Sequence, residues 1–202
     1  MKPALLLIDL QNDFCPGGAL AVNEGDLVIA VANRYAHDFH QHGYPIIATL
    51  DWHPADHGSF ASNAGQPVGS LGTLHGLPQV WWPDHCVQKT SGAELHPGFD
   101  EHLLTTCIYK GTVPLVDSYS AFFDNGRRQS TRLDHWLKER EIDELTVMGL
   151  ATDYCVKYSV LDALSLGYRV SVIIAGCRGV NLLPEDSNNA LEEMRQAGAI
   201  IV

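Results

Sequence analysis

The sequence has few basic residues, no long hydrophobic run and no closely paired cysteines. Lysine and arginine together number 13 against 24 acidic residues, which gives a formal net charge of −11. Nucleic acids and anionic membranes are bound by basic surfaces, so this charge argues against both as partners. The first apolar stretch, ALLLI, is too short to cross a bilayer and lacks the charged start and cleavage site of a signal peptide.

The five cysteines are odd in number, scattered and without any C-x-x-C pair. This pattern suits free thiols in a reducing compartment better than a disulfide framework, so we expect a cytoplasmic protein. A chain of 202 residues with ordinary globular composition suits one domain. We therefore predict a single domain over residues 1–202.

Short apolar runs alternate with helical patterns along the chain, which predicts an α/β fold with a mainly parallel sheet. Six runs are interpreted as strands, over residues 3–10, 44–50, 105–110, 144–150, 168–175 and 199–202. Helical spacing and end signals predict helices over residues 26–42, 130–140, 153–166 and 186–196.

Between residues 52 and 97 the periodicity fails, and glycine, proline, histidine, asparagine and serine become frequent. A connection of this length inside a domain is usually functional or disordered. Its tryptophans and repeated histidines argue against disorder. We expect an active-site loop region at about residues 52–97.

Four chemically capable residues lie at or just beyond the ends of predicted strands: Asp9, Asp51, Lys110 and Cys155. Taken singly, each has an ordinary explanation, such as a turn-forming aspartate, a solvated lysine or a buried thiol. Ligands of open parallel sheets bind outside the carboxyl ends of the strands, so the four together indicate a site at that edge. Cys177 also follows a predicted strand but has no comparable partners.

Cys155 has the strongest local pattern of the four. Thr152 or Asp153 is expected to cap the following helix, which leaves the thiol in the first turn, where backbone N–H groups favour a thiolate. Asp9 is a candidate general base for the thiol proton, and Lys110 would favour the ionised forms of both neighbours. The three residues supply a nucleophile, a proton shuttle and a positive charge.

The DWH triplet at residues 51–53 suggests a second cluster. Alternate residues of an extended segment point to one side, so Asp51 and His53 can address one ion, with His85 of the loop region as a third ligand. Two histidines and one carboxylate suit Zn²⁺, Fe²⁺ or Mn²⁺. The alternative is a loop held together by hydrogen-bonded imidazoles.

Six segments of the chain together resemble one family, the nicotinamidases (or pyrazinamidases) of the isochorismatase-like cysteine hydrolase superfamily. They are LLLIDLQNDFCPGGALAV, ATLDWHPADHGSF, WPDHCVQKTSGAELHP, YKG, DSYSAFFDNG and VMGLATDYCVKYSVLDAL. The resemblance runs from residue 3 to the end, in order and without a large gap. It implies a three-layer αβα sandwich of Rossmann-like, isochorismatase-like topology.

The resemblance also assigns roles to residues. It implies a catalytic triad of Asp9, Lys110 and Cys155. A cis peptide bond before Ala151 would help to aim the backbone N–H groups of Ala151 and Cys155 at the substrate oxygen, as an oxyanion hole. It further implies a substrate pocket that is lined by Phe14, Trp82 and Tyr119, although Tyr119 also suits simple core packing.

For the second cluster, the resemblance implies one divalent metal ion on Asp51, His53 and His85, with zinc expected and iron or manganese as alternatives. Some relatives add a further ligand from the segment after D-x-H. Here that segment offers His57, a weak candidate, and Ser59, and water is the third possibility.

The implied activity is amide hydrolysis of nicotinamide to nicotinate and ammonia through a cysteine thioester, in NAD salvage (pyridine nucleotide biosynthesis), with pyrazinamide as a further substrate. Related amidases that act on carbamoyl or ureido compounds share the trio but generally work without this metal. Isochorismatase itself does not use this cysteine, so Cys155 argues against it. A non-catalytic binding protein on the same fold is the alternative from another class.

Overall fold

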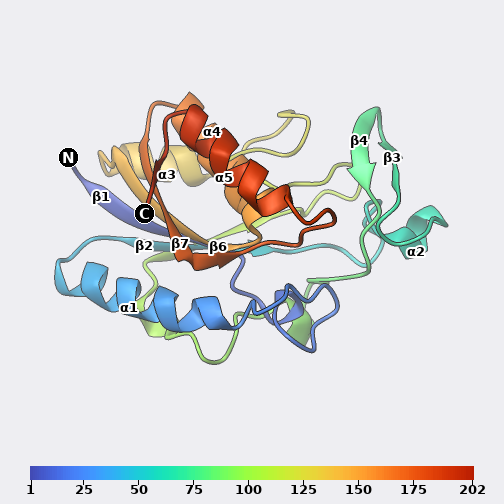
Figure 1. The fold of residues 1–202 in the computed structure, drawn as a ribbon, viewed down its shortest axis with the longest axis horizontal. Coiled ribbons are helices and arrows are strands. Elements are labelled where there is room, and N and C mark those ends of the chain that lie inside the picture. Colours follow the sequence, from blue (N-terminus) through green and yellow to red (C-terminus); the bar gives the residue numbers. More distant parts are fainter.

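A six-stranded sheet forms the centre of the computed structural model, which describes residues 1–202 (Figure 1). The strands follow the order β5-β2-β1-β6-β7-β8, and every neighbouring pair is parallel. They are β1 (Pro3–Ile8), β2 (Ile46–Asp51), β5 (Thr106–Lys110), β6 (Glu144–Leu150), β7 (Arg169–Arg178) and β8 (Ile200–Ile201). All six coincide with the apolar runs that predict strands, and the sheet is wholly rather than mainly parallel.

Helices cover both faces of the sheet, which confirms the predicted three-layer sandwich. Helix α1 (Leu27–Gln41) lies on one face, and α3 (Leu133–Glu139), α4 (Lys157–Ser165) and α5 (Asp186–Gln196) lie on the other (Figure 1). Because both faces are covered, the strands need apolar residues at every position rather than at alternate ones. The β1 residues from Ala4 to Ile8 are accordingly all buried.

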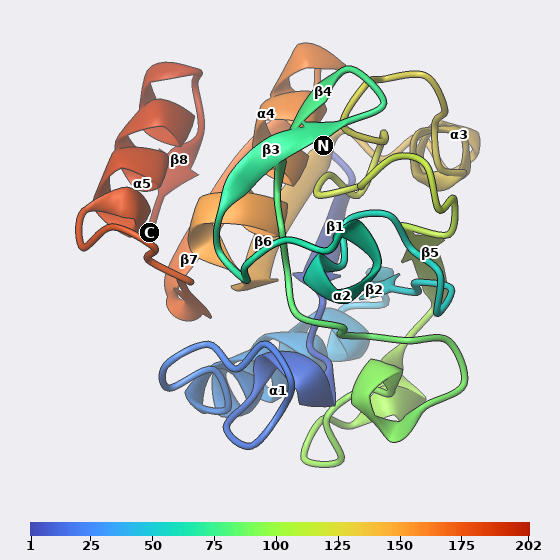
Figure 2. The same cartoon turned by 90° about the vertical axis from the view of Figure 1, so that its right-hand side faces the viewer.

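The segment between β2 and β5 contains short elements that the sequence did not predict. They are helix α2 (Ala61–Ala64) and an antiparallel hairpin of β3 (Leu71–Leu74) and β4 (Leu77–Val80). Each has four residues and little buried surface, and Leu71 is 80% exposed, so no hydrophobic period marks them. Figure 2 shows the hairpin and α2 in front of the carboxyl edge of the sheet.

The strand order reverses beside β1, which has β2 on one side and β6 on the other. The crevice outside the strand ends at such a reversal is the usual ligand position of an open parallel sheet. Asp9 follows β1 directly, and Cys155 lies in the turn after β6. The topology therefore brings these two residues, 146 positions apart in the chain, to the same crevice.

The helix after β6 begins differently from the expectation. A π-helical turn, Thr152–Val156, precedes α4, and neither Thr152 nor Asp153 caps it with its side chain. The Asp153 carboxylate instead accepts hydrogen bonds from the backbone N–H groups of Val180 and Asn181. The predicted capping role was wrong because this carboxylate is engaged by a segment 27 residues further along the chain. None of the helices combines the length and the apolar character needed to cross a membrane.

Candidate active site

The Lys110 ammonium is the point at which the predicted catalytic residues meet. Its Nζ lies 2.8 Å from Asp9 Oδ2 and 3.4 Å from Cys155 Sγ. It also forms an ion pair with Asp51 and donates a hydrogen bond to the Ser118 carbonyl at 3.1 Å. All these side chains are buried, so the structure brings together the predicted trio and one predicted metal ligand around a single buried cation.

Strand ends place these groups. Lys110 and Asp51 are the last residues of β5 and β2, and they are paired in register. Asp9 adopts a left-handed conformation, with φ of 49°, directly after β1. The Thr49 hydroxyl donates a 2.6 Å hydrogen bond to Asp9 Oδ1, which leaves Oδ2 facing Lys110. The rule that parallel strands end at one edge thus accounts for the whole arrangement.

The two carboxylates beside Lys110 are held in different states. Burial raises the pKa of Asp9, since the opposing effect of Lys110 only partly offsets the loss of solvent. Burial alone would also raise the pKa of Asp51, but Lys110 and His53 together hold it well below its ordinary value. Burial alone would lower the pKa of Lys110, but the carboxylates of Asp51 and Asp9 raise it well above its usual range. Asp51 is therefore a fixed negative charge, whereas Asp9 is the more basic carboxylate and suits proton transfer.

The Cys155 thiol lies in the π-helical turn and faces the pocket. Burial raises its pKa well above the ordinary value, although Lys110 acts in the opposite direction, and the nearby Asp9 and Asp51 add to the rise. The expectation that the helix start favours a thiolate in the free protein is therefore not met, because desolvation and two carboxylates outweigh it. The thiol needs a base, and the Asp9 carboxylate has an oxygen within 4.8 Å of the Cys155 sulfur.

Asp51, His53 and His85 converge as the sequence predicted. Asp51 Oδ2 lies 3.5 Å from His53 Nε2 and 3.7 Å from His85 Nε2. The Nδ1 atoms of the two histidines contact the Gly111 and Pro83 carbonyl oxygens at 2.8 and 2.7 Å. Since a carbonyl oxygen only accepts, each Nδ1 carries a proton, and in the neutral form of each ring Nε2 has the lone pair that a metal ion needs.

These donors fit a divalent metal ion. The three ligand atoms lie within 4.8 Å of one another, and the buried His53 Nε2 has no hydrogen-bond partner in the chain. Hydrogen bonds account for the Nδ1 side of each ring, and both Nε2 atoms face Asp51 Oδ2, as expected for ligands of one ion. A candidate metal site is thus present next to the predicted catalytic trio.

His57 and Ser59 lie beside this set. The His57 Nδ1 contacts the Ser59 hydroxyl at 2.8 Å, and its buried Nε2 has no partner. Burial lowers the pKa of His57 to about 4, with His53 adding to the effect, so the ring is neutral. It groups with His53 and Asp117 rather than with the full set of three. His57 stays a candidate ligand, whereas the Ser59 hydroxyl is bonded to His57.

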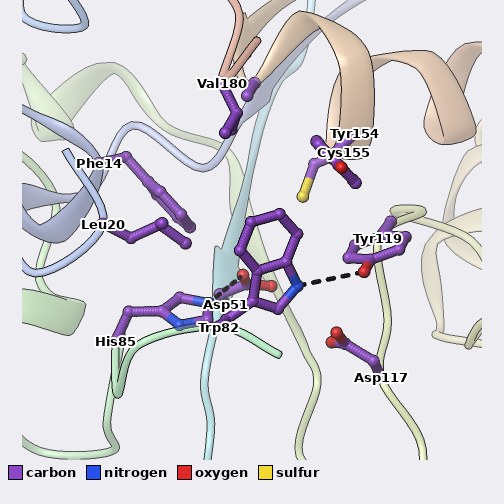
Figure 3. Close-up of a pocket in the computed structure, with 11 residues that line it drawn as sticks. Phe14, Leu20, Asp51, Trp82, His85, Asp117, Tyr119, Tyr154, Cys155 and Val180 are labelled. Carbon is purple, nitrogen blue, oxygen red and sulfur yellow. Dashed lines mark hydrogen bonds and ion pairs between the residues drawn. The ribbon is translucent and has the colours of Figure 1, made fainter. Parts of the chain in front are cut away.

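A pocket connects Cys155 with the candidate metal site (Figure 3). The predicted residues Phe14, Trp82 and Tyr119 all line it, together with Cys155, Asp51 and His85. The Trp82 indole donates a 3.1 Å hydrogen bond to the Tyr119 hydroxyl, which fixes two aromatic walls. Such flat walls suit a planar ring.

The pocket also contains residues that sequence reasoning missed, namely Leu20, Asp117, Tyr154 and Val180. Leu20, Asp117 and Tyr154 lie within segments that carry the family resemblance, and that was the available signal. Val180 lies in an irregular segment without such a signal. Ala151 lines the pocket beside Cys155, and the Leu150–Ala151 peptide bond is cis, as the resemblance implied.

Comparison with known proteins gives consistent matches over the whole chain. Residues 3–202 match the isochorismatase domain family. The nicotinamidase of Escherichia coli (strain K12) is 62% identical over 198 residues, which cover 98% of this chain and 93% of that protein. A solved Acinetobacter baumanii nicotinamidase/pyrazinamidase superposes with a TM-score of 0.94 at 39% identity, covering 100% of this chain and 95% of the other. A pyrazinamidase of Pyrococcus horikoshii, solved in complex with zinc, gives a TM-score of 0.82 at 38% identity, covering 100% and 99%.

Proposed function

The chain belongs to the isochorismatase family, and from this we propose that it is a nicotinamidase, an amidohydrolase that converts nicotinamide to nicotinate and ammonia. One observation carries the proposal: the Lys110 ammonium joins Asp9 to Cys155 at the base of an aromatic pocket that also reaches Asp51 and His85. The reaction would serve NAD salvage, and pyrazinamide, which differs by one ring nitrogen, would be a further substrate.

The pocket offers a site for each part of nicotinamide. Phe14, Trp82 and Tyr119 would hold the pyridine ring, with its carboxamide over Cys155. Asp51, His53 and His85 would hold one divalent ion, for which we propose zinc, with iron and manganese as alternatives and His57 or water completing the ligands. When bound, this ion would supply a Lewis acid that orients the ring through its nitrogen.

Acylation begins with proton transfer. Asp9 takes the proton of the Cys155 thiol, and the sulfur attacks the amide carbon. The oxyanion that develops on the carboxamide oxygen would be stabilised by the backbone N–H groups of Ala151 and Cys155, each worth about 3–4 kcal/mol. Asp9 then gives its proton to the departing nitrogen, the C–N bond breaks, and ammonia leaves a thioester on Cys155.

Deacylation uses the same base. Asp9, again ionised, takes a proton from water, and the hydroxide attacks the thioester carbon. The C–S bond breaks, nicotinate is released, and the proton on Asp9 returns to the Cys155 sulfur. Lys110 keeps its charge throughout and stabilises whichever of its two neighbours is negative.

We also propose that residues 1–202 act as one hydrolase domain, with the segment over about residues 52–97 as the wall above the active site. His53, Trp82 and His85 come from that segment, which supports this view. A cytoplasmic location is proposed as well, and the five free cysteines support it.

Ammonia release from nicotinamide and from a ureido amide, each with and without a chelator, tests the function. We expect turnover of nicotinamide, loss of that turnover after chelation, and recovery with Zn²⁺, Fe²⁺ or Mn²⁺. Preference for the ureido amide with indifference to the chelator would instead identify a carbamoyl or ureido amidase. Tight binding of nicotinamide without any turnover would identify a binding protein.

A further inference from the structure

Asp153, two residues before Cys155, is a buried carboxylate for which the proposed reaction has no use. It is 6% exposed. Its Oδ1 accepts a 2.9 Å hydrogen bond from the Val180 N–H, and its Oδ2 accepts a 2.8 Å hydrogen bond from the Asn181 N–H. Hydrogen bonds to a charged acceptor are stronger than neutral ones. Both oxygens of the group are thus committed to one segment.

That segment, residues 179–185, connects β7 to α5 and has few other anchors. Residues 181–185 are all exposed, including the apolar Leu182 and Leu183. On the α5 side, the Asn181 side-chain oxygen accepts a hydrogen bond from the Ser187 N–H. On the sheet side, the Asp153 carboxylate is what ties the backbone of residues 180 and 181 to the turn after β6.

Val180 is the residue of this segment that lines the pocket. Figure 3 shows it at one end, between Phe14 and Leu20 on one side and Cys155 and Tyr154 on the other. Asp153 and Cys155 belong to the same π-helical turn. The carboxylate therefore fixes the distance between the turn that carries the nucleophile and the Val180 wall.

We infer that Asp153 is a positioning residue that sets the width of the pocket at Val180, and with it the size of the aromatic ring that the enzyme accepts. This inference rests on the proposed function, since it concerns the ring of the amide substrate. Val180 packs against the hydrophobic core, and its backbone is held by Asp153 as well, so this wall keeps its position while the pocket fills and empties. The two hydrogen bonds that the Asp153 carboxylate accepts from Val180 and Asn181 are called the tether below. Their loss would let Val180 move away from the substrate ring.

Asp153→Asn keeps the shape of the side chain but replaces one acceptor by an NH₂ group that faces an N–H. We expect KM for nicotinamide to rise about tenfold while kcat stays within about threefold. The ring preference is the ratio of kcat/KM for a ring-methylated nicotinamide to kcat/KM for nicotinamide. This ratio should be about tenfold higher in the variant than in the wild type, because the extra methyl group now fits.

Val180→Ala tests the same wall without touching the tether. It should shift the ring preference in the same direction, and Val180→Leu should shift it in the opposite direction. In the double variant Asp153→Asn/Val180→Ala, the shift should not exceed the larger single one, since both changes act on one wall. Asp134→Asn is the matched control. The Asp134 carboxylate accepts a 2.8 Å hydrogen bond from the Tyr168 hydroxyl, and neither residue lines the pocket. The KM and the ring preference of this variant should equal those of the wild type.

Two kinetic results would overturn the inference. One is a fall in kcat for both amides in Asp153→Asn with the ring preference unchanged, which would mean that Asp153 acts on the Cys155 turn alone. The other is an unchanged ring preference in both Val180 variants, which decides the matter even if Asp153→Asn does not fold.

Amide hydrogen exchange of residues 179–183 measures the tether without substrate. Exchange should be at least about tenfold faster in Asp153→Asn than in the wild type and in Asp134→Asn. Equal exchange would contradict the inference, whatever the enzyme hydrolyses. Absence of ammonia release from nicotinamide by the wild type would contradict the proposed function, and the exchange result would still decide whether Asp153 holds the wall.

Discussion

Lys110 is the residue on which the charges of the site depend. Asp9 and Asp51 are both buried, and Lys110 is the cation that contacts both. Without it, two like charges would remain in a low-dielectric interior, where each costs several kcal/mol. The residue thus stabilises the fold as well as the reacting groups.

Lys110→Met should abolish ammonia release and lower the free energy of unfolding at neutral pH by about 3–5 kcal/mol. The loss should depend on pH. The pKa of Asp9 is already raised by burial from its ordinary value of 3.8, and loss of the cation would raise it further. A carboxyl group whose pKa is higher in the folded than in the unfolded protein stabilises the fold while it is protonated. This stabilisation is complete below the pKa of the unfolded state and is lost as the pH rises through the pKa of the folded state.

The pH effect can be measured by urea unfolding of chelator-treated wild type and variant. The destabilisation of Lys110→Met relative to the wild type should be smaller at about pH 5 than at about pH 8. Equal destabilisation at both values would show that Lys110 acts through packing and not through charge.

Cys155→Ala should reduce ammonia release from nicotinamide by at least about 10⁴-fold, as expected for loss of a nucleophile. The fold should be retained, because the change removes one sulfur from the pocket wall. Cys177→Ala is the control. Cys177 is also buried, and burial raises the pKa of its thiol to about 12, but no catalytic group contacts it. Full activity in Cys155→Ala would contradict the mechanism.

The residues of the site were predictable where they follow strands. Asp9, Asp51, Lys110 and Cys155 could be located because parallel strands end at one edge, and His53 through its spacing from Asp51. The tether from Asp153 to Val180 spans 27 residues, and an aspartate near a helix start suggests a cap far more readily. Contacts of this kind carry no local pattern, so only the structure shows them.

At the scale of elements, β6 is the strand on which the site depends. It lies between β1 and β7, and its register with β7 shifts between Val147 and Gly149. Gly149 has φ of 136°, and a β-carbon at this position would collide with the carbonyl oxygen of Ile8 on β1. This close approach brings the end of β6, and the turn that follows, next to Asp9.

Gly149→Ala should therefore lower the free energy of unfolding by about 3 kcal/mol or more, since it adds a backbone collision to an unfavourable φ. Gly43→Ala is the matched control. Gly43 has φ of 70° with nothing within 4 Å of its added carbon, so the cost should be about 1 kcal/mol. Urea unfolding of both variants measures the difference, and equal costs would show that the approach to Ile8 is unimportant.

The sheet and its four larger helices followed from the sequence, because long apolar runs and helical periods each bury a continuous surface. The hairpin β3–β4 and helix α2 did not. They are short, and contacts between distant residues hold this segment in place, such as the hydrogen bond from the Gly58 N–H to the Pro114 carbonyl at 2.8 Å. Hydrophobic pattern identifies elements that build the core, whereas elements that cover a site are specified by longer-range contacts.

At the scale of the whole molecule, the candidate metal site adds a link between a central strand and the segment in front of the sheet edge, which are already joined by a backbone hydrogen bond between His53 and Cys86. Asp51 ends a central strand, whereas His85 belongs to the segment in front of the sheet edge. An ion held by both would tie that segment to the sheet. A ligand that binds only the folded state stabilises it by about 2.7 kcal/mol at a hundredfold excess over Kd.

Chelation should then lower the thermal unfolding midpoint by about 5–10 °C, because a loss of about 2.7 kcal/mol corresponds to a shift of this size in a chain of this length. Zn²⁺ should restore both the midpoint and the activity. Hydrogen exchange should quicken in residues 80–87 but not in β1 or β6, because the sheet keeps its own hydrogen bonds.

His85→Ala should have the lower midpoint even before chelation and should show no further response to the chelator. His96 lies outside the donor set, so His96→Ala should respond like the wild type. A wild-type midpoint that ignores the chelator while activity is lost would mean that the ion orients substrate without holding the segment.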